Sequence, residues 1–556
     1  MEKRLLLAFV LSAAILLAWS VIFPPPERQP PTVSGAVPTE AVPAEKPALA
    51  TGDETSPAVT SEKPVATAEI PAAPPTNEVI IALAEQEVEL NNEQIAVVLT
   101  NRGAAVSSYR LLGYDNDEGQ PLDLIQTVPL PEATRPLQLI TAEGIDETLY
   151  VVEETADGVV FRWSDGRGNG VTKRISLSAL GYGLDVEIET SGTMVGASMS
   201  IGTGMRDLSE RERDSRLALW GEGVVLADGE LTRHKRSKVK EERDLRPQAL
   251  NYAGFEDGYF LDVFRPQGGV SEVTIEPFEY GIADDELMRV LRIAVVPAGV
   301  ELQGQLLGVP KEYYLLQEIG DGVEKTLTFG WFLTPIAVFF LKALQWIYSV
   351  VGNWGVAIIL LTLGIRIVLF PLMHTSTVSM RKMAKVQPKV KEIQGKYKKK
   401  KTDPQARAKM NQEMMALYKQ EGVNPMAGCL PMLVQMPLLF ALYQLFLKAI
   451  ELRHAPFILW ITDLSAKDPY YVTPILMTAT MWLQQRLAPQ AGDPQQQRLM
   501  RMMPLIFGIM FLQFPSGLVL YWLTNNIITI IQQEITLHMI GERKRGGGKR
   551  KKDGKK

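Results

Sequence analysis

Apolar residues along this chain gather into a few long runs, and the first of them opens the sequence. It extends from Leu5 to Phe23, about 19 residues or roughly 28 Å of helix, which is enough to cross the hydrocarbon core of a bilayer. A cleaved signal peptide is the alternative, but this run is long for one and ends at Pro24 without a small-residue cleavage site. We therefore predict that residues 1–23 are an uncleaved transmembrane anchor, and that the basic residues Lys3 and Arg4 keep its N-terminus in the cytoplasm.

The apolar pattern changes to a period of two between residues 78 and 325. Ile95–Leu99, Val159–Trp163 and Leu184–Glu189 have the composition and length of strands, and turn signals such as Asn101-Arg102-Gly103 separate them. Long helical patterns are scarce, so we predict a large all-β sandwich over 78–325. Residues 24–77 are rich in Pro, Ala, Thr and Glu and lack apolar periodicity, which predicts a disordered linker.

A second group of apolar runs begins after residue 352, and basic loops separate its members. Val356–Leu372 is followed by residues 374–424, which contain 13 Lys and Arg against 4 Asp and Glu. Such a basic stretch belongs in the cytoplasm, so this span runs inward from a large domain that lies outside. The apolar segment Trp331–Ile347 cannot also cross, because the basic stretch would then face outward. We predict that 326–352 forms an amphipathic interfacial helix on the outer membrane surface.

The remaining apolar runs supply the other spans. Phe514-Pro515-Ser516-Gly517 is a helix breaker that divides the last run, Met502–Ile531, into two short spans and so returns the basic tail to the cytoplasm. The predicted core at 353–540 has transmembrane helices near 355–372, 428–447, 470–487, 500–514 and 518–538. With the anchor, they make a polytopic α-helical membrane protein of six spans whose termini both lie in the cytoplasm.

Charge is divided between the two parts of the chain. The net charge of −5 hides 26 Lys and Arg against 51 Asp and Glu in residues 24–330, and 30 against 11 in residues 331–556. An acidic body and a basic, apolar half are typical of a chain that a bilayer divides. The single cysteine, Cys429, lies in an apolar stretch, so no disulfide can form within the chain.

Basic residues concentrate in the predicted cytoplasmic parts. Residues 376–423 have the pattern of a helical hairpin, with Thr402-Asp403-Pro404 as a helix start and Gly422 as a stop. The tip of the hairpin and the 541–556 tail supply candidate docking residues, which are Lys398, Lys399, Lys400, Lys401, Arg543, Lys544 and Arg545. These cations suit anionic lipid headgroups, and they suit equally the RNA phosphates of a ribosome or of the targeting machinery. The sequence leaves both interpretations open.

One charge lies inside a predicted span. Arg366 is about 11 residues, roughly 16 Å, from the outer end of Val356–Leu372. An arginine at a helix centre costs about 2.5–3.5 kcal/mol on insertion scales, so it needs a compensating environment. Its side chain either reaches the cytoplasmic surface, about six residues away, or faces a hydrated cavity between helices.

Polar residues in the predicted spans favour a cavity. Thr362 lies one helical turn before Arg366, and further candidates for the same groove are Gln435, Thr478, Asn525 and Asn526. No acidic residue lies deep in a predicted span, so Arg366 lacks an obvious permanent counter-ion. A secondary transporter would have an intramembrane carboxylate and an internal repeat, and neither is evident. We expect a site that attracts negative charge transiently, although each polar residue alone also fits helix–helix packing.

The acidic domain offers little for catalysis. General acid–base chemistry usually needs a histidine or a tuned carboxylate. The only histidine of this domain, His234, lies in the charged run Arg233–Lys238, which favours an exposed loop, and no pair of acidic residues stands out. We expect a binding or scaffolding domain without enzymatic activity, metal or cofactor. A sugar-modifying enzyme on a membrane anchor remains the alternative.

Several motifs resemble those of the YidC/Oxa/Alb family of membrane protein insertases, in the Gram-negative form that has a large periplasmic domain. They are Gly352-Asn353-Trp354-Gly355, Arg366 with Phe370-Pro371-Leu372, Gln412–Tyr418, Val423-Asn424-Pro425, Gly428-Cys429-Leu430-Pro431, Gln435-Met436-Pro437, Asp468–Tyr471 and Phe514–Trp522. The resemblance is specific in the C-terminal half and weaker over 24–320. Trp522 departs from the family pattern, because a second tyrosine is common there after Tyr521.

The resemblance implies a five-helix insertase core around a hydrophilic groove that is open to the cytoplasm and to lipid. Arg366 matches the family's groove arginine, and Tyr521 and Trp522 are expected to line the same groove. The periplasmic sandwich would be related to sugar-mutarotase folds but lack their activity. Such proteins insert small proteins into the bacterial inner membrane alone and assist the Sec translocon with larger ones. The implied partners are nascent inner-membrane proteins, the Sec translocon with its accessory subunits, the ribosome, the signal recognition particle receptor and anionic lipids.

Overall fold

The computed structural model describes residues 78–213, 221–281, 287–329, 333–397, 403–423, 430–487 and 494–545. All described residues belong to one compact unit. The predicted anchor at 1–23, the predicted linker at 24–77, the lysines at 398–401 and the tail from 546 to 556 lie outside the described residues.

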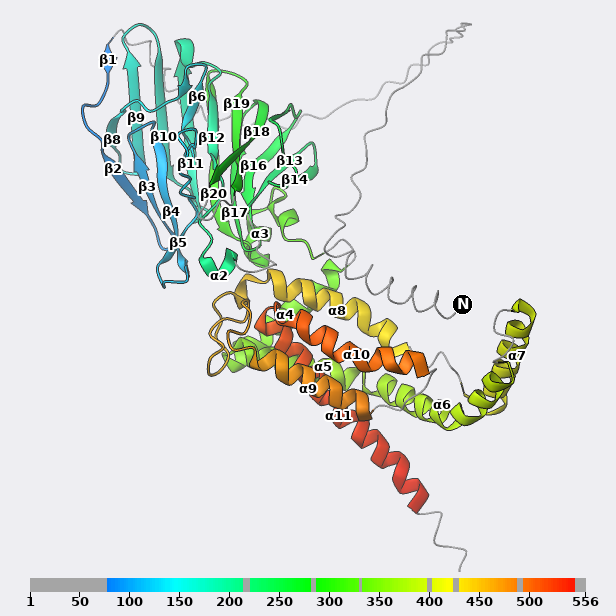
Figure 1. The fold of residues 1–556 in the computed structure, drawn as a ribbon. Helices are drawn as coiled ribbons and strands as arrows, with labels where there is room; N and C mark the ends of the chain where they lie inside the picture. The colour runs from blue at the N-terminus through cyan, green and yellow to red at the C-terminus, as the bar shows by residue number, and fades with distance from the viewer. Residues whose placement is uncertain are drawn as a thin grey trace, which may run out of the picture. The chain divides into compact units, whose positions relative to one another are not determined.

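A β-rich domain forms the first part of the described chain, and its strands make three antiparallel sheets (Figure 1). The 10-stranded sheet contains, in spatial order, β1 (Val79–Ile80), β9 (Gly158–Asp165), β10 (Gly170–Leu177), β11 (Gly183–Ser191), β20 (Glu301–Pro310), β17 (Phe260–Pro266), β16 (Leu250–Glu256), β13 (Glu222–Ala227) and β14 (Glu230–His234), with β8 (Val151–Glu154) also paired to β9. The 6-stranded sheet contains β15 (Arg243–Leu245), β18 (Val270–Gly281), β19 (Leu287–Pro297), β12 (Ser198–Thr203), β6 (Leu139–Thr141) and β7 (Gly144–Ile145). The 4-stranded sheet contains β2 (Glu87–Asn91), β3 (Ile95–Thr100), β4 (Ala105–Asp115) and β5 (Pro121–Asp123). The predicted β-rich body is confirmed.

The core of this domain combines side chains from all three sheets. Strand β10 alternates between buried and half-buried positions, as the two-residue period of a strand requires. The alternation places Lys173 on the buried face, where its ammonium group donates to the carbonyl oxygens of Gly103 at 2.6 Å, Ala104 at 3.0 Å and Leu137 at 2.6 Å. Three protons therefore meet three acceptors, which is the condition under which a protein core tolerates a cation.

His234 does not lie in an exposed loop, contrary to the expectation from its charged neighbours. It ends strand β14 and is 8% exposed. In the antiparallel pair with β13, His234 stands opposite Gly223, where an added Cβ would lie 3.3 Å from the His234 Cβ. The ring nitrogen Nε2 lies 3.2 Å from the Thr232 hydroxyl. Strand pairing therefore buries His234 within the β-rich domain.

Helices make up most of the described chain after residue 312. In chain order they are α3 (Tyr313–Ile319), α4 (Thr334–Val351), α5 (Trp354–Val368), α6 (Phe370–Lys396), α7 (Pro404–Gln420), α8 (Leu430–Lys448), α9 (Val472–Leu487), α10 (Pro494–Phe511) and α11 (Ser516–Arg545). The short elements are α2 (Glu210–Arg213) and the 3-10 turns η1 (Gly192–Met194), η3 (Val323–Thr326) and η6 (Ile450–Leu452). Helix α11 packs against both α5 and α9, while α10 packs against α9. Asp403 caps α7 by accepting a hydrogen bond from the Gln405 amide at 2.9 Å, so α7 begins at the predicted start signal.

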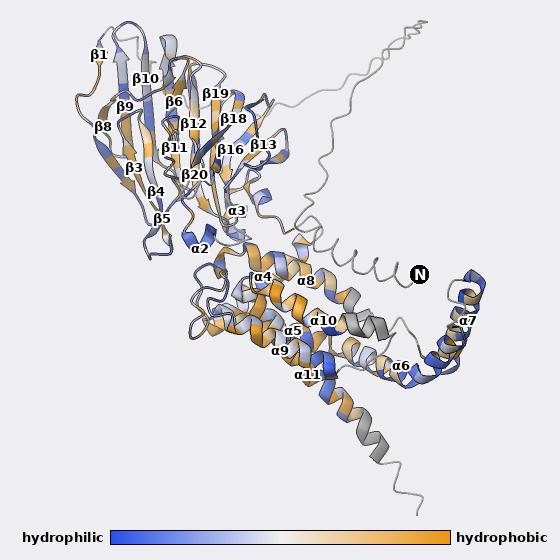
Figure 2. Cartoon of the chain, in the orientation of Figure 1, coloured by the Kyte–Doolittle hydropathy of each residue, from blue (hydrophilic) through white to orange (hydrophobic). Residues whose placement is uncertain are grey.

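Hydrophobicity distinguishes the helices from one another (Figure 2). Apolar residues dominate α4, whereas α7 is largely hydrophilic. By length and composition, α4 is the one described helix that is apolar and long enough to cross a membrane, and α5 with α6 qualifies as a second if that bent pair is one span. The sequence predicts instead that α4 lies along the outer membrane surface, and this remains a prediction.

The predicted span at 355–372 is not one straight helix. Helix α5 ends at Val368, α6 begins at Phe370, and the chain bends by 61° between them. Pro371 explains the break, because proline has no N–H for the Ile367 carbonyl and its ring crowds the preceding turn. A second break, at residues 512–515, separates α10 from α11, at the Phe514–Gly517 breaker. Helix α11 continues to Arg545, several residues beyond the predicted end at 538.

Candidate functional site around Arg366

Arg366 lies in the last turn of α5 and is buried, with 4% of its surface exposed. Its Nε donates a hydrogen bond to Asn525 Oδ1 at 2.6 Å, which joins α5 to α11. Its Nη1 is buried and has no hydrogen-bond partner among the described residues. Because a guanidinium can donate five hydrogen bonds, this cation keeps donors for a partner outside the described chain.

A second polar contact lies on the same face of α11. Tyr521 precedes Asn525 by one turn, so the two side chains point in the same direction. Gln435 of α8 donates its Nε2 hydrogen to the Tyr521 hydroxyl at 3.1 Å, and Tyr521 is almost completely buried. The Tyr521 hydroxyl is also near enough to Arg366 to interact with it electrostatically. The structure therefore brings four of the predicted groove residues together from α5, α8 and α11.

Both predicted groove threonines form hydrogen bonds within their own helices. Thr362 is buried, and its hydroxyl donates to the Ile358 carbonyl oxygen at 2.7 Å. Thr478 donates to the Pro474 carbonyl oxygen at 2.7 Å and lies against Gly508 of α10. Thr362 therefore shares the helix of Arg366, whereas Thr478 contributes to the packing of α9 against α10.

Asn526 and Trp522 lie on a different face of α11, about 100° around the helix from Asn525 and Tyr521. The Asn526 amide nitrogen lies 3.4 Å from the Met477 carbonyl oxygen of α9. The Trp522 ring stacks on Phe507 at 6.2 Å between centroids and contacts Phe511 at 5.0 Å, and both phenylalanines belong to α10. The described contacts thus join Asn526 and Trp522 to the α9–α10 pair and not to Arg366.

Helix α11 supplies two more polar contacts that the sequence analysis did not single out. Gln532 donates its Nε2 hydrogen to the main-chain carbonyl oxygen of Arg366 at 3.0 Å. One turn later, the Thr536 hydroxyl lies 3.1 Å from Nδ1 of His374 on α6. Helical spacing from Asn525 was the available signal, but α11 has polar residues on several faces, so spacing alone does not select these two.

No carboxylate pairs with Arg366 among the described residues, and Tyr521 is the one ionisable group there that acts on it. Glu534, the acidic residue of α11 nearest in sequence to this region, is exposed. The described residues contain no group of three His, Cys, Asp or Glu side chains that could hold a metal ion. The site is a buried cation in a neutral polar environment.

The predicted docking residues fall at the limits of the structure. Lys398, Lys399, Lys400 and Lys401 lie outside the described residues, and Arg543, Lys544 and Arg545 end helix α11 without described side chains. Lys389 of α6 forms an ion pair of 2.5 Å with Glu421, the residue that directly follows α7. A small apolar cluster of Val386, Val390 and Val423 packs between the two helices.

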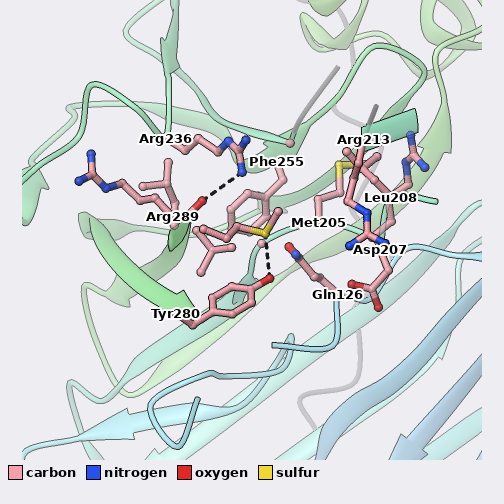
Figure 3. Close-up of a pocket in the computed structure, with 15 residues that line it drawn as sticks. Gln126, Met205, Asp207, Leu208, Arg213, Arg236, Phe255, Tyr280 and Arg289 are labelled. Carbon is pink, nitrogen blue, oxygen red and sulfur yellow. Dashed lines mark hydrogen bonds between the residues drawn. The ribbon is translucent and has the colours of Figure 1, made fainter. Parts of the chain in front are cut away.

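A cavity of about 200 Å³ lies in the β-rich domain and is lined by four arginines among other residues (Figure 3). Figure 3 shows Arg236, Arg289 and Tyr280 toward one side of Phe255, and Asp207 toward the other. Most of these polar groups have partners within the domain. Arg289 pairs with Glu279, Arg236 donates to the Arg289 carbonyl oxygen at 3.3 Å, and the Tyr280 hydroxyl donates to Met288 Sδ at 2.9 Å. Arg236 and Arg289 therefore bind groups of the β-rich domain itself.

Comparison with known proteins covers both parts of the chain. The family described as "60Kd inner membrane protein" matches residues 346–543, and the family described as "YidC periplasmic domain" matches residues 87–346. A membrane protein insertase YidC of Geobacter metallireducens is 35% identical over 96% of this chain and 98% of the relative. The corresponding protein of Syntrophus aciditrophicus is 36% identical over 96% of this chain and 99% of its own length.

A solved structure, titled "Active YidC insertase crystal structure with the first transmembrane domain resolved", is also similar to this chain. It is 20% identical, covers 82% of this chain and 94% of its own, and has a TM-score of 0.35. The full-length relatives carry the assignment, because their identity exceeds 30% over nearly the whole chain. The resemblance found in the sequence motifs is thereby confirmed, and this chain belongs to the YidC family of membrane protein insertases.

Proposed function

We propose that this chain inserts proteins into the bacterial inner membrane and helps them fold, and that a substrate's polar tail passes through a groove beside Arg366. The observation that carries the proposal is the state of the guanidinium. It is buried, it bonds to Asn525, and its Nη1 has no partner among the described residues. A buried cation with donors to spare stabilises an anion that arrives from outside, and an acidic tail supplies that anion.

The mechanism is energetic and needs no covalent step. A charged tail that crosses intact hydrocarbon loses its hydration, which costs several kcal/mol per ion even after relaxation. An opposite charge at about 4 Å returns roughly 4 kcal/mol at an effective dielectric constant of 20. The apolar segment of the substrate then leaves sideways into lipid, along the α9–α10 faces where Leu476, Trp482 and Ile509 are exposed.

The proposal includes the topology predicted from the sequence, with six spans, cytoplasmic termini and a periplasmic β-rich domain. It also includes the interfacial position of α4. Two observations support that position: Phe339 and Trp346 are largely exposed, and the Lys342 ammonium group lies over the rings of Tyr313 and Tyr314 at 5.4 and 5.6 Å. The aromatic residues would enter the headgroup region, and the lysine would stay outside the hydrocarbon.

We further propose the partners that the basic segments suit. The lysine tip at 398–401 and the residues Arg543, Lys544 and Arg545 would contact the ribosome, the signal recognition particle receptor or anionic lipids, because clustered cations bind phosphate groups. Larger substrates would be handed over from the Sec translocon and its accessory subunits. Nascent inner-membrane proteins are the substrates in each case.

The proposal is tested with purified chain in proteoliposomes that contain no other protein. A short membrane protein with an acidic periplasmic tail should insert, as shown by protease protection of the tail. Insertion no greater than into empty liposomes would overturn the proposal.

A second form that lacks residues 78–320 should still insert this substrate. Loss of insertion in that form alone would favour an essential activity of the β-rich domain.

A further inference from the structure

Three side chains on one face of α11 connect it to both halves of the bent α5–α6 element. Asn525, Gln532 and Thr536, which we call the α11 seam, are separated by seven and four residues, so they lie within about 40° of one another around the helix axis. Asn525 bonds the Arg366 side chain, Gln532 bonds the Arg366 main chain, and Thr536 bonds His374 beyond the bend. The seam therefore spans the break in the helix.

Within the α11 seam, Gln532 is the residue that bonds to the main chain of α5 at the bend. The bend after Val368 interrupts the helical hydrogen bonds at the end of α5, where carbonyl oxygens lose their usual i+4 donors. The Arg366 carbonyl oxygen accepts the Gln532 amide hydrogen at 3.0 Å. Within a bilayer, an unsatisfied carbonyl group costs several kcal/mol, so this bond favours the bent form.

Arg366 is consequently held from two sides by one helix. Its Nε is bonded to Asn525 and its main chain to Gln532, two turns or roughly 10.5 Å further along α11. With the main chain loose, the last turn of α5 could unwind and the long side chain could extend to the cytoplasmic surface. With both bonds in place, the guanidinium stays buried and its Nη1 stays available.

We propose that Gln532 is a positioning residue for Arg366, which acts by capping the last turn of α5 and fixing the bend that keeps the guanidinium in the groove. This inference rests on the proposed function, in which Arg366 attracts acidic tails. Gln532 does not itself contact the substrate. Gln532 fixes the position of the Arg366 guanidinium. Loss of the Gln532 side chain should therefore remove the preference for substrates with acidic tails and leave the insertion of substrates with neutral tails unaffected.

The chain contains a matched control beside Gln532. Gln533 has the same side chain at nearly the same depth, but it lies about 100° further around α11. Its Oε1 is buried without a partner among the described residues. The Gln532 Oε1 is likewise buried without a partner among the described residues. Gln533→Leu therefore makes the same change of side chain as Gln532→Leu, without removing the bond to Arg366.

The experiment compares insertion of two substrates that differ only in tail charge, neutral or acidic, into proteoliposomes with each variant. Gln532→Leu and the shorter Gln532→Asn should lower insertion of the acidic-tailed substrate roughly three- to fifteenfold and leave the neutral-tailed one within about twofold. Gln533→Leu should resemble the unaltered protein. In the Arg366→Leu background, Gln532→Leu should have no further effect, because no cation remains to be positioned.

Equal losses for both substrates, a Gln533→Leu result equal to Gln532→Leu, or an added loss in the Arg366→Leu background would each overturn the inference. Insertion of the neutral-tailed substrate shows that each variant is folded. The proposed function fails separately. If Arg366→Leu itself does not discriminate between the tails, the role of Arg366 is wrong, whereas a discriminating Arg366→Leu with a silent Gln532→Leu refutes only the role of Gln532.

Discussion

Two buried arginines, one in each half of the described chain, show how the β-rich domain differs from the helical core. Arg206 follows β12, and its side chain is 2% exposed. Its Nε contacts Asp257 at 2.5 Å, and its two terminal nitrogens contact Glu212 at 2.9 and 3.0 Å. Arg366 is buried to a similar degree, yet its side chain bonds to Asn525 and its Nη1 has no partner among the described residues.

The two arginines differ in whether the protein itself neutralises the buried charge. Although burial alone would lower the pKa of Arg206, Asp257 and Glu212 hold that pKa above its usual value. Every nitrogen of Arg206 has a carboxylate, so the group is complete without any other molecule. Arg366 has a neutral amide where Arg206 has two carboxylates. In the proposed function, the acidic tail of a substrate supplies the negative charge that Arg366 lacks. Substitutions in each half of the described chain test this contrast.

Arg206→Met should strongly destabilise the β-rich domain. The substitution leaves Asp257 buried without its cation, and breaking a buried ion pair typically costs about 3–5 kcal/mol. Hydrogen–deuterium exchange of the β16 and β17 amides in the full chain reports the loss as reduced protection. Arg246→Met is the control, because the Arg246 side chain is 77% exposed and its pair with Glu272 should contribute less than about 1 kcal/mol. Equal protection in the two variants would contradict the structural role of Arg206.

Asp262 is a buried acid near Asp123, and it tests whether an acid without a cation is kept neutral. Burial, with a smaller contribution from Asp123, raises the pKa of Asp262 to about 8. Between its ordinary value near 3.8 and about 8, the unfolded carboxyl is ionised while the folded one stays protonated. The stability that Asp262 contributes is therefore greatest at low pH and falls by up to about 1.4 kcal/mol for each pH unit in that window.

Asp262→Asn keeps the neutral shape and should abolish that slope, which amounts to roughly 2–3 kcal/mol between pH 6 and pH 8. The measurement is the protection of β17 amides as a function of pH. Asp157→Asn, on an exposed loop, should leave the slope unchanged. If the slope of Asp262→Asn equals that of the unaltered chain, Asp262 is charged in the folded protein, and burial without a cation does not keep this acid neutral.

Two glycines of the helical core test the packing on either side of α11. A Cβ on Gly508 would overlap the Thr478 side chain, whereas a Cβ on Gly364, two residues before Arg366, would meet nothing within 4 Å. Gly508→Ala should therefore lower stability by about 1–2 kcal/mol. Gly364→Ala should be neutral or stabilising by up to about 1 kcal/mol, because alanine favours the helix. Thermal unfolding in detergent compares the two, and a larger loss for Gly364→Ala would place close packing where we describe open space.

The sequence could predict the division of the chain because each part has its own hydrophobic period. The strands, the break between α10 and α11 and the isolated cation at Arg366 all follow from local patterns. The partners of Arg366 were only partly predictable. Asn525 was among several polar residues of the last span, whereas Gln532 reaches the Arg366 carbonyl oxygen only because the chain bends after Val368.

Trp522 and Thr478 show that residue type alone does not identify which side chains lie beside Arg366. Both are the right kind of residue for a groove, yet Trp522 stacks on Phe507 and Thr478 lies against Gly508. The face of α11 that contacts α5 depends on how the helices pack together, and amino-acid composition does not determine this packing. Membership of a groove therefore requires the three-dimensional arrangement, even where the residue types are read correctly.

The most direct test of the central claim is the charge dependence of insertion at Arg366. Proteoliposomes with the unaltered chain, Arg366→Lys or Arg366→Leu are given a series of substrates whose tails carry increasing numbers of acidic residues. Arg366→Leu should insert the neutral tail normally and the most acidic tail roughly tenfold less, equivalent to about 1.4 kcal/mol, while Arg366→Lys should insert both. Equal insertion of every tail by Arg366→Leu and the unaltered chain, or an equal loss for neutral and acidic tails, would contradict the account.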